Sequence, residues 1–284
     1  MRQEEAEADR TRKEVLKRFI REAPAKIKAS REPGEIVRLM TEHVGVAGQQ
    51  EAGCAALWNI CVDNDATKAK VALLGGIEAV LAGMDAHAGV EGVQEHGCEA
   101  LHNLCINNDA NRIKVARLCG IETVVAGMRA HVGVEGVQGA GCRVLWSLGL
   151  NNDANRDKIV GHDGVEAVVA GMRAHEGSAV VQTQGCDTLA NVCLADGANS
   201  VKVAALGGIE AVVAGMRAHA GAVGVQQQGC WALNNLCDNA SNLKRMKALG
   251  TLREVREVVK SAIAAHPSIS RVQDWGKRVL SKLA

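Results

Sequence analysis

The sequence is poor in aromatic residues, and this limits the kind of core that it can build. Only 2% of the 284 residues are aromatic, tyrosine is missing and Phe19 is the single phenylalanine, although 47% of the residues are hydrophobic. We therefore expect a core of Ala, Val, Leu, Ile, Cys and Met. These small side chains suit closely stacked helices.

Long apolar runs are also missing. The sequence contains no stretch of about 18 apolar residues, which a membrane-spanning helix would need. The N-terminal segment MRQEEAEADRTRKEV is too charged for a secretory signal. We expect a cytoplasmic or nuclear protein. The net charge of +1 gives no overall attraction to nucleic acid, anionic membranes or acidic substrates.

Catalytic motifs are missing as well. The chain has no GxSxG, HExxH or P-loop sequence. Its Cys, His and Asp residues are mostly periodic, whereas an active site is a unique arrangement of nucleophile, base and orienting group. We predict that the protein is not an enzyme, has no catalytic residue and needs no cofactor.

What the chain does contain is an internal repeat. The segments GCAALWNIC, GCEALHNLC, GCRVLWSLG, GCDTLANVC and GCWALNNLC follow one another at a constant step. Their first cysteines are 44 residues apart, at Cys54, Cys98, Cys142, Cys186 and Cys230. The segment GGIEAVLAGMDAH from Gly75 and three similar segments keep the same step. Such a period indicates one elongated array with a continuous core in place of two globular domains.

The sequence pattern predicts three helices in each unit. In the last full unit they cover about residues 199–206, 209–219 and 223–237. The third helix carries an apolar stripe at helical spacing. Between the first two, Gly207 and Gly208 allow a sharp turn with positive φ. N-caps of the first helices are expected at Asp65, Asp109 and Asp153. Glycines recur in the middle of the second helices, where we expect another helix backbone to approach, at Gly83, Gly127, Gly171 and Gly215.

This three-helix unit resembles the armadillo repeat of importin-alpha-like and beta-catenin-like proteins. The segment GGIEAVVAGM is similar to the family's second helix, and VQQQGCWALNNLC, with Trp231 and Asn235 four residues apart, to its third. The resemblance covers about residues 34–284. It implies an all-α, right-handed superhelical solenoid of about six repeats, the last a degenerate cap. Residues 1–33 are expected to form a charged N-terminal capping helix.

The segment HGCEALHNLC, residues 96–105, raises the question of a zinc site. Cys98 and Cys105 are repeated core positions, however, and only His96 and His102 are peculiar to this unit. A tetrahedral zinc site needs about four convergent ligands, whereas His102 is predicted to lie opposite the cysteines. We predict no metal site. The cysteines are interpreted as small buried hydrophobic residues in a reducing compartment.

Histidines and lysines also recur with the period. The histidines could sense pH, but capping of their own helix ends is the favoured interpretation for His43, His87, His131, His175 and His219. Basic rows that could engage phosphates are formed by Lys70, Lys114, Lys158 and Lys202 and by Arg129, Arg173 and Arg217. An acidic row beside them favours a solvated surface, namely Glu78, Glu122, Glu166 and Glu210.

Recognition is expected where the units differ on an exposed face, because residues shared by all units hold them together. The third helix opposite its apolar stripe offers such positions. The candidate site residues are Asn59, Glu95, Glu99, Asn103, Arg143, Ser147, Asp187, Asn191, Trp231 and Asn235. The acidic members, together with Glu51, favour a basic partner, and Arg143 is the exception.

The resemblance implies that this helix lines a concave groove. It also implies that an asparagine ladder bonds the backbone of an extended peptide, through Asn59, Asn103, Asn191 and Asn235. The alternative is that these amides bond neighbouring helices. Ser147 interrupts the ladder, and Trp58 and Trp146 are expected to flank the groove.

We therefore predict a protein-interaction scaffold that binds an extended, basic segment of a protein partner. One alternative is a nuclear-import cargo adaptor, although only Trp231 matches the tryptophan array that this would need. A second is phosphate binding, of nucleic acid or acidic lipid, by the basic rows; nucleic acid is not the favoured partner. A third is an engineered or consensus repeat array, suggested by the constant step.

Overall fold

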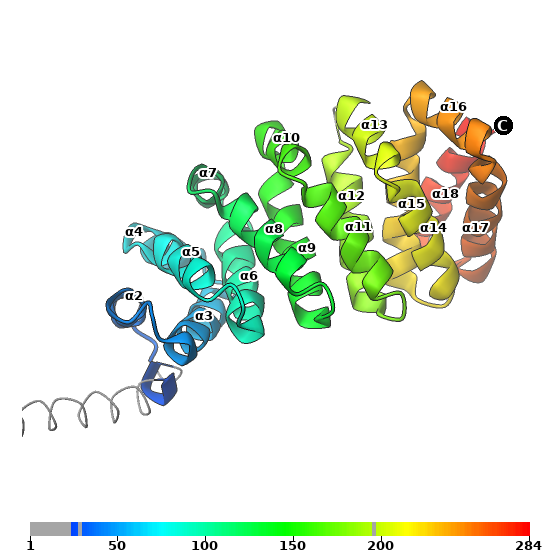
Figure 1. Cartoon of the computed structure of the whole chain (residues 1–284). Coiled ribbons are helices and arrows are strands. Elements are labelled where there is room, and N and C mark those ends of the chain that lie inside the picture. The colour runs from blue at the N-terminus through cyan, green and yellow to red at the C-terminus, as the bar shows by residue number, and fades with distance from the viewer. Residues whose placement is uncertain (1–23, 28–29, 195–196) are drawn as a thin grey trace, which may run out of the picture. The chain divides into compact units, whose positions relative to one another are not determined.

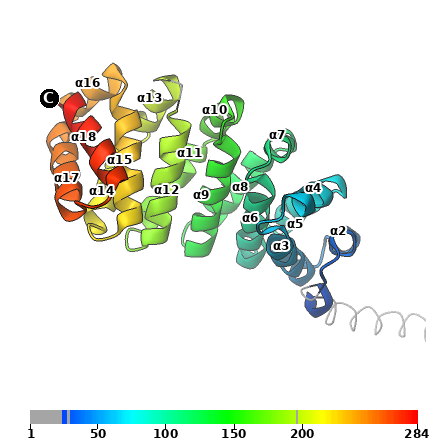
Figure 2. The same ribbon diagram turned by 180° about the vertical axis from the view of Figure 1, so that it is seen from behind.

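The computed structural model describes residues 24–27, 30–194 and 197–284. All regular secondary structure in these ranges is helical, and the helices carry the labels α2 to α18 (Figure 1, Figure 2). The predicted all-α fold class is confirmed. No helix in these ranges is both long and apolar enough to cross a membrane. The capping helix predicted for residues 1–33 falls largely on residues 1–23 and 28–29, outside the described part of the chain.

The chain divides into two compact units, residues 1–114 and 115–284. The first unit contains α2 (Pro33–Glu42), α3 (Ala47–Cys61), α4 (Asp65–Leu73), α5 (Gly76–Ala86) and α6 (Glu91–Cys105), and α7 (Asp109–Arg117) crosses the boundary. The second contains α8 (Gly120–Ala130), α9 (Glu135–Gly149), α10 (Asp153–Gly161), α11 (Gly164–Ala174), α12 (Ala179–Val192), α13 (Gly197–Ala205), α14 (Gly208–Ala218), α15 (Val223–Cys237), α16 (Ala240–Leu249), α17 (Thr251–Ala265) and α18 (Ser270–Lys282).

The predicted three-helix repeat is present in both units. A first helix of 9 residues, a second of 11 and a third of 15 recur, as in α4, α5 and α6. In the last full unit, α13, α14 and α15 begin and end within two residues of the predicted helices. Within each unit, successive third helices pack side by side: α3 against α6, and α9, α12, α15 and α18 in order (Figure 1, Figure 2). The last repeat differs by a longer second helix, since α17 has 15 residues.

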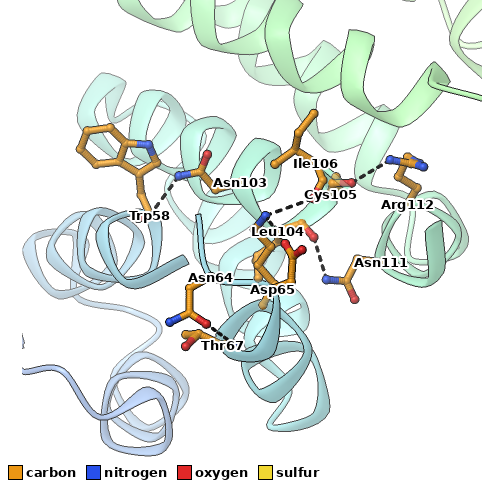
Figure 3. A network of polar contacts seen from close by, with 11 residues as sticks. Trp58, Asn64, Asp65, Thr67, Asn103, Leu104, Cys105, Ile106, Asn111 and Arg112 are labelled. Atoms are coloured by element: carbon orange, nitrogen blue, oxygen red, sulfur yellow. Dashed lines mark hydrogen bonds and ion pairs between the residues drawn. The ribbon is translucent and has the colours of Figure 1, made fainter. Parts of the chain in front are cut away.

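The turns between helices follow the predicted chemistry with one correction. Gly75 and Gly207 have φ angles of 84° and 85°, as the glycine pairs predicted. The predicted N-cap Asp65 is instead the first residue of α4, and the cap is Asn64, whose side chain accepts from the Thr67 N–H (Figure 3). The prediction was wrong by one residue. The amide of Asn64 caps the helix, and the carboxylate of Asp65 lies in the first turn, where the helix dipole favours negative charge.

Small residues let the second and third helices approach each other closely. Every cysteine except Cys119 is buried, and burial raises the pKa of the Cys54 and Cys105 thiols to about 12, so these thiols stay protonated.

The glycine that precedes each repeated cysteine faces a methionine. A Cβ atom added to Gly141 would lie 2.5 Å from Cγ of Met128. Methionine therefore fills the space that glycine leaves, and this pairing recurs in the five repeats that carry the cysteine.

A buried glutamine joins each third helix to the second helix before it, which the sequence pattern did not predict. Nε2 of Gln138 donates to the carbonyl oxygens of Met128 and His131, at 2.8 and 2.9 Å. These carbonyls belong to the end of α8, where a helix leaves acceptors without a partner inside the helix, and that of His131 also accepts from the Val134 N–H. The equivalent pair of hydrogen bonds is made by Gln50, Gln94, Gln182, Gln226 and Gln273.

The same glutamines explain the glycines in the middle of the second helices. A Cβ atom at Gly83 would lie 2.6 Å from Oε1 of Gln50, which belongs to the third helix of the preceding repeat. Gly171 and Gly215 face Gln138 and Gln182 in the same way. The prediction that a helix backbone approaches these glycines was wrong, because a side-chain amide occupies the space.

The periodic histidines and lysines link successive repeats. Nε2 of His87 lies 2.7 Å from the Val44 carbonyl oxygen, and His175 and His219 make the equivalent contact. Each of these histidines is the C-cap of its own helix, as predicted, but through its backbone N–H. The ring was predicted beside the last carbonyls of that helix, and instead it contacts an acceptor in a loop of the preceding repeat. Lys158 and Lys202 donate to carbonyls at the ends of the preceding first helices, at 3.1 and 2.6 Å. Lys114 does the same at Ala72.

Candidate functional site

The predicted site residues lie on the third helices, and those outside the buried positions 147, 191 and 235 lie on the face away from the core. In α6, Val93 and Leu101 are fully buried, whereas Glu95 and Glu99 are half-buried. The four-residue spacing of the glutamates keeps them on one side of the helix. The third helices therefore combine a constant buried stripe with a variable outer face.

In the first unit, α3 and α6 carry an acidic face, defined by Glu51, Glu95, Glu99 and His96. Nδ1 of His96 lies 2.9 Å from Oε2 of Glu99, and this hydrogen bond raises the pKa of His96 against the effect of its burial. The carboxylate of Glu51 reaches α6, since a Cβ atom at Gly92 would lie 2.9 Å from Oε2 of Glu51. The acidic face thus collects negative charge from two neighbouring helices.

Three of the four asparagines of the ladder form hydrogen bonds within the protein. Nδ2 of Asn103 donates to the Trp58 carbonyl oxygen at 3.1 Å (Figure 3), and Nδ2 of Asn235 donates to that of Ala190 at 2.9 Å. Asn59 is exposed and bonds the Ala55 carbonyl of its own helix. These contacts support the interpretation that the amides join neighbouring helices. Recognition of a peptide backbone by the ladder stays a prediction.

Accessibility separates the ladder into two parts. Asn59 is exposed and Asn103 is half-buried, whereas Ser147, Asn191 and Asn235 are only 0%, 1% and 8% exposed. The amide of Asn191 makes no side-chain hydrogen bond with the described residues. It lies against Gly149, where the other repeats carry cysteine, so that any larger residue would displace it. Amides accessible to a partner therefore occur mainly in the first unit.

In the second unit the third helices enclose a pocket with a cavity volume of about 380 Å³. We call it the tryptophan pocket; its lining residues are Trp146 of α9, Asp187 of α12, Gln228 and Trp231 of α15, and Arg271 and Trp275 of α18. Three of the four tryptophans of the chain line it. Arg271 is exposed, and the other five residues are half-buried.

Asp187 is the only acidic residue of the tryptophan pocket, and its environment is unfavourable for charge. Burial raises the pKa of its carboxyl group from 3.8 to about 6, and the positive charge of Arg271 opposes this shift. The carboxylate makes no hydrogen bond or ion pair with the described residues. A carboxylate that is half-buried without a partner is costly, which marks Asp187 as a candidate functional residue.

The structure brings some predicted residues together and leaves others apart. Asp187 and Trp231 share the tryptophan pocket, and Glu95 and Glu99 share the acidic face. Arg143 is half-buried on α9 and does not line the tryptophan pocket.

Three lining residues of the tryptophan pocket were missed in the sequence. Trp275 and Arg271 lie in the last repeat, which the sequence pattern marks only as a degenerate cap, and Gln228 was not singled out. The available signal was a tryptophan beside the repeated glycine in the segment VQDWGKRVLSKL.

The structure separates the residues of the segment that suggested zinc. Cys98 and Cys105 are 1% and 0% exposed in the core, and His96 lies on the acidic face. Among residues 24–27, 30–194 and 197–284, no group of three or more His, Cys, Asp or Glu side chains is placed to hold a metal ion. Metal independence of the whole chain stays a prediction.

Comparison with known structures identifies the fold. A designed armadillo repeat protein superimposes with a TM-score of 0.74 at 14% identity, over 89% of this chain and 100% of that one. The chain has the armadillo-repeat fold. A crystal structure of an engineered protein has a TM-score of 0.74 at 21% identity, covering 88% of this chain and 96% of that one.

A second designed armadillo repeat protein, in complex with the peptide (KR)4, has a TM-score of 0.72 at 14% identity and covers 89% of this chain and 100% of that one. No protein-family model and no curated protein sequence matches the chain. At these identities the similarity establishes the fold alone.

Proposed function

We propose that this armadillo-repeat protein is an interaction scaffold that holds an extended, basic segment of a protein partner against its third helices. The observation that carries the proposal is the placement of carboxylates on those helices. Glu51, Glu95 and Glu99 gather on α3 and α6, and Asp187 lies in the tryptophan pocket. The net charge of the chain is only +1, so this negative charge is local.

A scaffold of the same fold offers a precedent for the ligand class. The designed armadillo repeat protein that resembles this chain is in complex with (KR)4, a peptide of alternating lysine and arginine. The low identity means that the precedent supports the chemistry of the partner and not any single contact. In this proposal the chain binds and positions its partner and catalyses no reaction.

Phosphate binding by the basic rows has weaker support. Lys114, Lys158 and Lys202 each donate to a backbone carbonyl of the preceding repeat, and Lys114 also lies 2.8 Å from the carboxylate of Glu78. These contacts give the lysines a structural role and place negative charge beside one of them. A phosphate would have to compete with both.

The proposal is tested with a fluorescently labelled (KR)4 peptide in anisotropy titrations of the full chain at low and moderate salt. Glu99→Lys should weaken binding about two- to tenfold, since carboxylates that solvent reaches each contribute a few tenths to 1 kcal/mol. Arg143→Glu should strengthen it by a similar factor. The matched control is Glu257→Lys, the same charge change on the exposed surface of α17.

Two results would reject the proposal. One is binding of (KR)4 that none of the three substitutions changes, and the other is an equal loss with Glu257→Lys and Glu99→Lys. Binding of nucleic acid or anionic vesicles with a steep salt dependence, lost on Lys158→Glu, would favour the basic rows instead.

A further inference from the structure

A different pocket lies in the first unit, between second helices rather than third helices. α2 and α5 pack against each other, and the pocket between them has a cavity volume of about 450 Å³. We call it the α2–α5 pocket; its lining residues include Met40, Thr41, Val44, Leu74, Glu78 and Ala82. Its wall is mostly apolar, and its volume is large enough to hold several apolar side chains.

The α2–α5 pocket is open because α2 lacks a side chain that spans the equivalent gap in the second unit. There the arginine near the end of one second helix pairs with an acidic residue of the next. Arg129 lies 2.9 Å from Asp163, and Arg217 lies 3.1 Å from Glu254. Thr41 stands two repeats of 44 residues before Arg129. It is too short to cross the gap, and its hydroxyl donates to a carbonyl of its own helix.

Apolar side chains are exposed in this part of the first unit. Of the lining residues, Leu74 is 44% exposed and Val44 38%. Leu73, the neighbour of Leu74 in the sequence, is 87% exposed. Later repeats carry no large apolar residue at its position, which is taken by Arg117, Gly161 and Ala205. Exposed apolar surface around a pocket indicates that another segment covers it.

The chain before the first described residue supplies a segment of matching chemistry. Residues 13–21 read KEVLKRFIR. Their apolar members recur at helical spacing and form one stripe, at Val15, Leu16, Phe19 and Ile20. The four basic residues of the segment could keep their charged ends in solvent while this stripe is buried. Phe19 is also the single phenylalanine of the chain.

The described chain begins within reach of the α2–α5 pocket. A Cβ atom at Gly48, in the first turn of α3, would lie 3.8 Å from Cγ of Pro24. Only the short turn between α2 and α3 separates Gly48 from Val44, which lines the pocket. Five residues span up to about 17 Å, so Phe19 can reach the Val44 side of the pocket from Pro24.

We propose that residues 13–21 pack their apolar stripe into the α2–α5 pocket of the same chain, with Phe19 inserted between the two helices. The N-terminal segment thus closes the gap that an arginine spans in the second unit. Its apolar residues and those of the pocket leave water together, which is favourable. The assignment concerns the second helices and does not rest on the proposed binding of a partner by the third helices.

The first test records the methyl NMR signals of the methionines in the full chain. Met40 lines the pocket, and an aromatic ring close to a methyl group shifts its signal. Replacing Phe19 and Ile20 together by serine should therefore move the Met40 signal. The signal of Met128, at the equivalent position of α8, should stay unchanged.

A matched control uses the polar side of the same segment. Glu14→Ser combined with Lys17→Ser removes two charges of opposite sign and leaves the net charge and the apolar stripe unchanged. The Met40 signal of this variant should match that of the wild-type chain.

The second test supplies the segment as a separate, fluorescently labelled peptide of residues 10–23. It should bind the chain with Phe19→Ser and Ile20→Ser at least about tenfold more tightly than the wild-type chain. In the wild-type chain the tethered segment competes for the pocket at a high effective concentration. Adding Thr41→Arg to the serine variant places the arginine of α8 over the pocket and should weaken peptide binding about tenfold. Thr41 is exposed, so this substitution is compatible with folding, which circular dichroism checks.

Several results would overturn the assignment. One is a Met40 signal that the serine substitutions leave in place. Others are a peptide that fails to bind the serine variant, binds both chains equally or ignores Thr41→Arg. A Met40 shift that depends on protein concentration, together with a dimer in light scattering, would place the segment of a second copy in the pocket and would also overturn it.

Discussion

The acidic face of the first unit and the tryptophan pocket of the second use the same backbone repeat in different ways. On α3 and α6, three half-buried glutamates gather and form a local negative charge. On α9, α12, α15 and α18, one carboxylate, Asp187, is withdrawn among indole rings. The first arrangement favours many weak contacts, and the second favours one desolvated contact. A periodic scaffold can therefore carry two modes of recognition, because its stacking residues and its outer residues occupy different positions.

The largest expected effect concerns the stacking residues. Gln182 donates to the carbonyls of Met172 and His175, and replacing it with alanine removes both hydrogen bonds, although the His175 carbonyl still accepts from the Ser178 N–H. Gln182→Ala should lower the free energy of unfolding by about 1–3 kcal/mol, measured by urea denaturation. Gln184→Ala, two residues away on the half-buried face of α12, should change it by less than about 0.5 kcal/mol. Equal effects of the two substitutions would remove the distinction between stacking and outer positions.

A smaller effect on stability is expected at Asp187. Burial raises its carboxyl pKa to about 6, so the folded chain holds this proton more tightly than the unfolded chain does. The stabilising contribution is complete below about pH 4 and is lost as the pH rises through about 6. Asn imitates the protonated carboxyl group. Asp187→Asn should therefore raise the free energy of unfolding at pH 7 by roughly 1–2 kcal/mol, after allowance for partial exposure, and change it little at pH 4.

The comparison at two pH values provides the control for this prediction. A stability gain of equal size at pH 4 and pH 7 would mean that the substitution acts through packing and not through the charge. Increased stability together with weaker binding of (KR)4 would show that Asp187 is kept for recognition at the expense of stability.

The fold was largely predictable because it repeats. Apolar spacing and the Gly207-Gly208 turn predicted the three helices of the last full unit within two residues of their observed ends. The glutamine ladder was not predictable, since Gln138 reads as a surface residue until the carbonyls of Met128 and His131 are placed beside it. Such hydrogen bonds depend on tertiary distances that spacing along the sequence does not contain.

The candidate site was predictable only in part, for a related reason. Helical spacing placed Glu95, Glu99, Asp187 and Trp231 on the outer faces of their helices. The tryptophan pocket also needs Trp275, which belongs to the repeat with the longest second helix and a shifted register. A pocket built from four helices depends on how their side chains meet, and a single helix pattern does not determine this.

Salt should weaken peptide binding more at the acidic face than at the tryptophan pocket. This effect is expected to be smaller than the two effects on stability. Raising the ionic strength from about 0.1 M to 1 M shortens the screening length from about 10 to 3 Å. Binding of (KR)4 should weaken steeply, and Glu99→Lys should make its salt dependence shallower. The loss of (KR)4 affinity caused by Asp187→Asn should depend less on salt, because Asp187 is partly desolvated. An equal salt dependence of the losses caused by Glu99→Lys and Asp187→Asn would show that both carboxylates act as one electrostatic surface.

The smallest expected effect, no change at all, concerns metal. If the acidic face held zinc through His96 and its neighbours, it would be a metal site. It could then not be compared with the tryptophan pocket as a second recognition surface. Cys98 and Cys105 are buried in the core, whereas His96 lies on the acidic face and is hydrogen-bonded to Glu99. These residues therefore do not converge on one point, as a zinc site requires. Elemental analysis of the purified chain should find no stoichiometric zinc, and a chelator should leave the midpoint of thermal unfolding unchanged. A bound equivalent of zinc whose removal melts the helices would show that the acidic face is structural rather than a surface for a basic partner.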